Sequence, residues 1–134
     1  MILPTGTTVA VVDGQKLRLF RNKGHEPHIE LVALPDPWIE PVNGGSGARH
    51  VSAAANPDEA RLREDDFAAA AAGFLNRQIL SGAIEKLFVI ADPRTLGEMR
   101  LHFRDTLTSR LEGTLAKDLA GNDADAIAAA ITRA

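Results

Sequence analysis

The run KLFVIA, residues 86–91, places the strongest constraint on how this chain can fold. Its apolar residues follow one another without alternation, which is the pattern of a strand covered on both faces in the centre of a sheet. A helical pattern precedes the run and another follows it. Because strand–helix–strand crossovers are right-handed in nearly all proteins, we expect this run to lie parallel to the first strand of the chain and beside it.

The beginning of the chain predicts an antiparallel meander. Residues 7–12 (TTVAVV) and 16–21 (KLRLFR) are two short β-type runs. The pair Asp13-Gly14 between them supplies the positive φ angles of a tight hairpin. A third run, residues 29–34, extends the meander by one strand.

The first helix is predicted from its two ends. Asn56 is placed as N-cap with Pro57 at the first helical position, and Gly82 provides a left-handed C-terminal stop near Ser81. Between these ends the apolar residues recur at spacings of three and four, which gives one buried stripe. They are Phe67, Ala71, Phe74, Leu75 and Ile79.

The remaining elements follow at once. Thr95 and Glu98 have the spacing of a capping box, and one helix is expected to continue from there with Leu96, Met99, Phe103 and Leu107 on its buried side. Residues 112–120 are predicted as the last strand and 122–133 as a closing helix. The order βββαβαβα predicts one domain of the α/β class, with a ribonuclease H-like, mixed five-stranded sheet.

A long segment, residues 35–57, interrupts this plan. It holds four of the seven prolines and three glycines, so no regular element is expected in it. Connections in compact domains usually have about 4 to 6 residues, and much longer ones are often functional. The segment is therefore the first place to look for function. Gly44 and Gly45 would let backbone amides approach an oxygen closely, Ser46 follows in the flexible loop, and Arg49 with His50 could meet a phosphate.

Composition excludes several classes of protein. The chain has no cysteine, so disulfides, cysteine-bound metals and thiol nucleophiles are excluded. No apolar stretch reaches the roughly 20 residues that a membrane helix needs, and no secretory signal is recognisable. A formal net charge of -3 neither steers the whole molecule toward nucleic acid nor forbids such binding. We expect a cytoplasmic protein without membrane insertion.

Two aspartates give an alternative enzymatic hypothesis. Asp13 and Asp92 are expected at neighbouring strand ends, with Glu64 or Asp65 available from the first helix. Ribonuclease H-like nucleases hold magnesium at such a place, and two metals need several converging carboxylates. The structural interpretation is stronger, because Asp-Gly hairpins and Asp-Pro helix starts select aspartate without any metal. We therefore predict no cofactor, and a metal site only in the nuclease alternative.

Arginines on the second helix give a candidate surface for nucleic acid. Arg94 precedes the expected helix, and Arg100, Arg104 and Thr108 follow at steps of four residues along its outer face. Such a stripe could follow a phosphate backbone. The structural interpretation is the stronger one: an ordinary solvated face on which Glu98 and Asp105 balance the charge of Arg100 and Arg104.

Several motifs together resemble the bacterial family of host attachment proteins over nearly the full length. These are the opening V-x-D-G-x-x-x-R-L-F, the sequence P-R-T-L-G-E at residues 93–98, and LAKDLAG near the end. That family is distantly similar to the middle domain of archaeal and eukaryotic peptide-chain release factors. In those factors a Gly-Gly-Gln loop before a long helix enters the ribosome and promotes hydrolysis of peptidyl-tRNA.

The resemblance gives the function we expect. Gly44 and Gly45 match the loop motif, but Ser46 stands where the motif has glutamine. The resemblance therefore implies a non-enzymatic binding protein whose partner is the ribosome, RNA or an unidentified protein. The competing hypothesis is an RNA-directed hydrolase, either release-like or a metal-dependent nuclease. Neither the partner nor the oligomeric state follows from the sequence.

Overall fold

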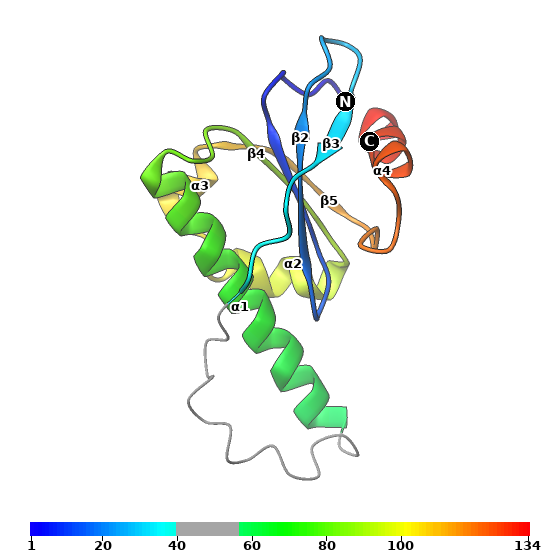
Figure 1. Ribbon diagram of the computed structural model, residues 1–134. Helices are drawn as coiled ribbons and strands as arrows, with labels where there is room; N and C mark the ends of the chain where they lie inside the picture. Colours follow the sequence, from blue (N-terminus) through cyan, green and yellow to red (C-terminus); the bar gives the residue numbers. More distant parts are fainter. Residues whose placement is uncertain (40–56) are drawn as a thin grey trace.

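The computed structural model describes residues 1–39 and 57–134, which form a single α/β domain (Figure 1). A mixed five-stranded sheet has the strand order β3-β2-β1-β4-β5. The elements, in chain order, are β1 (Thr8–Val12), β2 (Leu17–Asn22), β3 (Leu31–Ala33), α1 (Pro57–Ser81), β4 (Leu87–Ala91), α2 (Pro93–Arg100), α3 (Asp105–Thr108), β5 (Leu111–Ala116) and α4 (Ala124–Arg133). This confirms the predicted fold class.

The sheet is arranged as the central apolar run predicts. β4 pairs in parallel with β1, in a register that sets Thr8 opposite Leu87 and Val12 opposite Ala91. All five residues of each strand are buried. β1 also pairs antiparallel with β2 and β4 pairs in parallel with β5, so both central strands have a neighbour on each side. Complete burial explains the absence of alternation in their sequences.

Helices cover both faces of the sheet and make two hydrophobic cores. α1, α2 and α3 lie on one face and α4 on the other (Figure 1). Because successive side chains of a strand point to opposite faces, Val89 packs on the α1 side while Ile90 packs against α4. We call these two clusters the α1-side core and the α4-side core.

α1 ends where the sequence predicts. Gly82 has a φ of 86°, and its N–H donates to the carbonyl oxygen of Ile79 at 3.1 Å. This left-handed conformation is unstrained only for glycine, which confirms the predicted stop. The helix begins at Pro57 as expected, whereas the predicted cap Asn56 lies outside the described residues.

The prediction for the second helix was wrong at its start. The helix begins at Pro93, and its N-cap is Asp92, whose carboxylate accepts a hydrogen bond from the Thr95 N–H at 3.1 Å. Thr95 is therefore inside the helix and is buried. Proline at the first helical position fixes a suitable φ angle and needs no hydrogen-bond partner, so the Asp-Pro pair sets the start ahead of the expected capping box.

The second helix also ends earlier than predicted. α2 stops at Arg100, and the separate short helix α3 begins after Arg104, which is its N-cap. Asn76 of α1 lies at this break. Its amide donates to the carbonyl oxygen of His102 at 2.9 Å and accepts from the Arg104 N–H at 3.1 Å. These side-chain bonds satisfy backbone groups that an uninterrupted helix would have paired internally.

The last two elements are shorter than expected. β5 spans Leu111–Ala116 rather than 112–120, and α4 begins at Ala124 with Asp123 as its N-cap. The Asp123 side chain accepts from the Ala126 N–H at 2.9 Å.

Among the described residues, no helix combines the length and the apolar character needed to cross a membrane.

Candidate functional site

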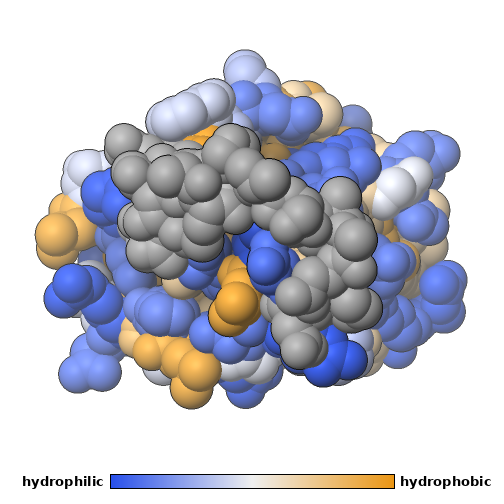
Figure 2. Space-filling model, turned by 90° about the horizontal axis from the view of Figure 1, so that it is seen from below, coloured by the Kyte–Doolittle hydropathy of each residue, from blue (hydrophilic) through white to orange (hydrophobic). Residues whose placement is uncertain are grey.

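The carboxyl ends of β1 and β4 define the candidate site. Both strands end at the lower edge of the sheet in Figure 1, where the β1–β2 turn also lies, and α1 begins beyond this edge and runs back past it. Asp13 follows β1 and Asp92 follows β4, as predicted. Figure 2 views the molecule from this end, where hydrophilic residues dominate and hydrophobic ones form separate spots.

Each of the two aspartates is engaged by the backbone. Asp13 Oδ1 accepts hydrogen bonds from the N–H groups of Gln15 and Lys16, both at 2.7 Å. This is the side-chain turn that aspartate forms readily at such positions. Asp92 caps α2 through Thr95. The structural interpretation of both residues therefore has direct support.

Two acidic residues of α1, Glu64 and Asp65, reach the same edge, where they lie against other elements. Asp65 accepts from Arg94, whose Nη2 lies 3.0 Å from each of the two carboxylate oxygens. Glu64 lies over the β1–β2 turn, because a Cβ added to Gly14 would come within 2.7 Å of its Cγ. In the part of the chain that the structure describes, no group of three or more histidines and acids could hold a metal ion.

The predicted arginine stripe is not a feature of one helix. Since α2 ends at Arg100, Arg104 belongs to the connection before α3. Arg94 is paired with Asp65, while Arg100 donates to the Thr114 hydroxyl at 2.6 Å and holds α2 against β5. Arg100 and Arg104 are both exposed. Their role as contacts to RNA or to a partner stays a prediction.

The loop candidates lie outside the described residues. They are Gly44, Gly45, Ser46, Arg49 and His50. What the structure shows is where the chain leaves and re-enters the described part. It leaves after Ile39, which packs against the α1-side core, and re-enters at Pro57, the first residue of α1.

Sequence reasoning missed Trp38, which directly precedes Ile39 in the chain. Its relative exposure is 77%. It is the single tryptophan of a chain in which aromatic residues make up only 4%. A tryptophan between prolines and the long glycine-rich segment was the available signal, but exposure depends on tertiary packing that local patterns do not report.

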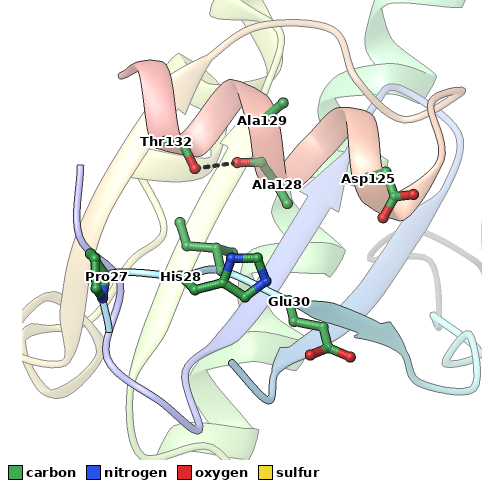
Figure 3. Close-up of a pocket in the computed structure, with 8 residues that line it drawn as sticks. Pro27, His28, Glu30, Asp125, Ala128, Ala129 and Thr132 are labelled. Carbon is green, nitrogen blue, oxygen red and sulfur yellow. Dashed lines mark hydrogen bonds between the residues drawn. The ribbon is translucent and has the colours of Figure 1, made fainter. Parts of the chain in front are cut away.

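An open groove of about 340 Å³ was also not predicted (Figure 3). It lies between residues 27–30 and α4. The carboxylate of Glu30 points away from α4, and the Thr132 hydroxyl donates to the Ala128 carbonyl oxygen of its own helix at 2.9 Å. The polar groups of Glu30 and Thr132 in this groove thus do not converge on one point, as those of a ligand pocket would.

Comparison with known proteins identifies the family. The family model described as "Bacterial archaeo-eukaryotic release factor family 12" matches residues 6–131. Among curated proteins, none matches the chain significantly. The match supports the predicted relationship to release factors and gives no support to the name host attachment protein. Because it covers almost the whole domain, including all five strands and every helix except the last two residues of α4, the chain belongs to bacterial archaeo-eukaryotic release factor family 12.

Proposed function

We propose that this protein is a non-enzymatic, translation-associated binding protein that contacts the ribosome or its RNA through residues 40–56. The observation that carries the proposal is the family match over residues 6–131. The resemblance to release factors implies a ribosome-contacting loop between the opening strands and a long helix. Residues 40–56 occupy that position here, between β3 and α1, and they include Gly44 and Gly45.

The scaffold around this segment supports a role in presenting it. Ile39 is anchored in the α1-side core before the segment begins. After it, α1 is held to α2 by the Asp65–Arg94 pair, and Glu64 of α1 lies over the β1–β2 turn. Anchoring both ends of a connection lowers the conformational entropy that is lost when the connection binds a partner.

Candidate contacts to RNA follow from charge. Arg49 and His50 lie within the segment, and Arg100 and Arg104 are exposed elsewhere on the domain. Arg94 is 48% exposed although it is paired. Each arginine that neutralises a phosphate would add to the salt dependence of binding, so the affinity would fall as the salt concentration rises. Association with ribosomes also implies the cytoplasmic location that the sequence predicts.

Co-sedimentation with bacterial ribosomes over a salt series tests this function. We expect association at low salt that is lost when residues 43–50 are deleted and weakened by Arg49→Gln combined with His50→Gln. Arg133→Gln in the last turn of α4 is the matched control, since it removes one exposed cation from another part of the domain. The absence of association at every salt concentration would contradict the proposal.

The second candidate is a hydrolase acting on peptidyl-tRNA, which Gly44-Gly45 and the family match favour. Ser46 in place of glutamine argues against it. Release of the peptide from a ribosome-bound peptidyl-tRNA, measured with the wild type and with Gly45→Ala, separates the two functions. Release by the wild type that the variant loses would establish the hydrolase.

The nuclease alternative has no comparable support, because Asp13 and Asp92 are already engaged by backbone N–H groups.

A further inference from the structure

Trp38 has an exposure that is unusual for its residue type. Tryptophan is highly buried on average because its indole carries a large apolar surface. Here 77% of the residue is exposed. An indole left in water does not contribute the favourable free energy of folding that its burial would provide. We therefore ask which kind of partner covers the ring when the protein functions.

The chain is anchored to the domain on both sides of Trp38. The Leu34 N–H donates to the Leu19 carbonyl oxygen at 2.9 Å, and the side chains of Leu34 and Ile39 pack against the α1-side core. Between these two anchors, Pro35 and Pro37 have φ angles fixed by their rings. The indole is thus held outward from an anchored segment, so a partner would lose little entropy in ordering it.

A single exposed ring suits one kind of partner better than another. The neighbouring apolar side chains Leu34 and Ile39 face the core, so Trp38 is the one large hydrophobic residue of the segment 34–39 that is more than half exposed. A protein partner usually needs a continuous apolar patch around such an anchor. An unpaired nucleobase needs only a flat aromatic face.

We propose that Trp38 stacks on an unpaired nucleobase of RNA. This inference rests on the proposed function and names the kind of contact that the ribosome-binding surface makes. Asp36, which lies two residues before Trp38 in the chain, is exposed. Phosphates would be repelled from it, so the base is one turned out from its backbone, as in a single-stranded loop, rather than one inside a duplex.

The contact can be tested with the intact chain. Trp38 is the only tryptophan, so its fluorescence reports this position alone. We expect a 12-nucleotide oligoadenosine RNA to quench the emission in a saturable way. An abasic ribose-phosphate oligomer of the same length should not do so. Equal quenching by both oligomers would overturn the proposal, because it would show that charge rather than base stacking causes the change.

Variants give the second measurement. The affinity for the labelled oligoadenosine, followed by anisotropy, should fall about tenfold in Trp38→Ala, since stacking on an aromatic ring contributes about 1–3 kcal/mol per base. Trp38→Phe should retain most of the affinity, and Asp36→Asn should increase it. Leu80→Ala is the matched control, because Leu80 is equally exposed at 76% but lies in the last turn of α1. Unchanged affinity in Trp38→Ala would overturn the proposal.

The outcomes separate this inference from the proposed function. If the wild type and Trp38→Ala bind ribosomes and RNA equally well, the stacking contact is wrong and the proposed function stands. If ribosomes change the fluorescence but the oligonucleotide does not, the ring contacts ribosomal protein and nucleobase stacking is wrong. If the oligonucleotide binds in a Trp38-dependent way but ribosomes do not bind, stacking is supported and the proposed function fails.

Discussion

Arg94 and Asp65 form a hydrogen-bonded ion pair in which Nη2 of the arginine lies 3.0 Å from each of the two carboxylate oxygens. The pair joins the first turn of α2 to the N-terminal half of α1. α1 is the element by which the chain re-enters the described part after residues 40–56. The pair therefore helps to fix the end of the segment that we propose to contact the ribosome.

Asp65→Asn should lower the free energy of unfolding by about 0.5 kcal/mol. The effect is small because Arg94 is 48% and Asp65 is 29% exposed, and exposed pairs are screened by solvent. Urea denaturation in low salt measures it, and the difference from wild type should shrink in about 1 M NaCl. A double-mutant cycle with Arg94→Gln isolates the pair. A coupling energy of zero would show that the observed geometry contributes nothing.

Asn22 should be far more important for stability than Asn76. Asn22 is fully buried; its amide donates to the carbonyl oxygens of Leu3 and Pro4, and its oxygen accepts from the N–H groups of Gly24 and Glu30. Asn22→Ala removes the partner of the Leu3 carbonyl oxygen and of the Gly24 and Glu30 N–H groups, while the Pro4 oxygen still accepts from the Thr7 N–H, and it should cost about 3 kcal/mol.

The half-buried Asn76 is the matched comparison for this prediction. It makes two backbone hydrogen bonds at the α2–α3 break, where water can replace them, so Asn76→Ala should cost about 1 kcal/mol. Thermal unfolding of both variants measures the two costs. Equal losses of stability would contradict the role of burial.

Two glycines should respond to alanine with opposite signs. A Cβ on Gly24 would lie 2.5 Å from the His28 carbonyl oxygen and 2.8 Å from the Glu30 N, and backbone atoms cannot move aside easily. Gly24→Ala should therefore destabilise the fold by about 2 kcal/mol or more, on the order of other overpacking mutations. Gly97 lies inside α2, where an added Cβ would meet nothing within 4 Å, so Gly97→Ala should stabilise by about 0.5–1 kcal/mol. Chemical denaturation of both variants checks the two signs.

The sheet could be predicted because its signals are local and agree with one another. The uninterrupted apolar run of β4 requires cover on both faces, and the hairpin between β1 and β2 forms where it was predicted. The expected positive φ at Gly14 was wrong. The turn is closed instead by Asp13, whose side chain accepts from the N–H groups of Gln15 and Lys16. The end of α1 could be predicted at Gly82, because glycine adopts the positive φ of a helix stop without strain and needs no distant contact to do so. These features leave little choice of strand order.

The interrupted second helix shows where local reasoning stops. Asp92 and Thr95 are both acceptable N-caps, and Pro93 favours the first. The break after Arg100 depends on Asn76, which is far away in the sequence. The same break divides the predicted arginine stripe, because that prediction assumed one unbroken helix from Arg94 to Thr108. The exposure of Trp38 likewise depends on where Leu34 and Ile39 pack.

Arg18 should hold the segment between β5 and α4 in place. Its Nη1 donates to the carbonyl oxygens of Ala120 and Asn122, at 2.9 and 2.7 Å, and its guanidinium lies 4.8 Å from the centre of the Phe20 ring. Lysine lacks the planar group that can donate and stack together, so Arg18→Lys should cost about 1 kcal/mol. Amide hydrogen exchange should accelerate most at residues 120–126 and least in β1. Uniform acceleration throughout the domain would contradict this local role, since it would place the loss in global unfolding rather than in release of this segment.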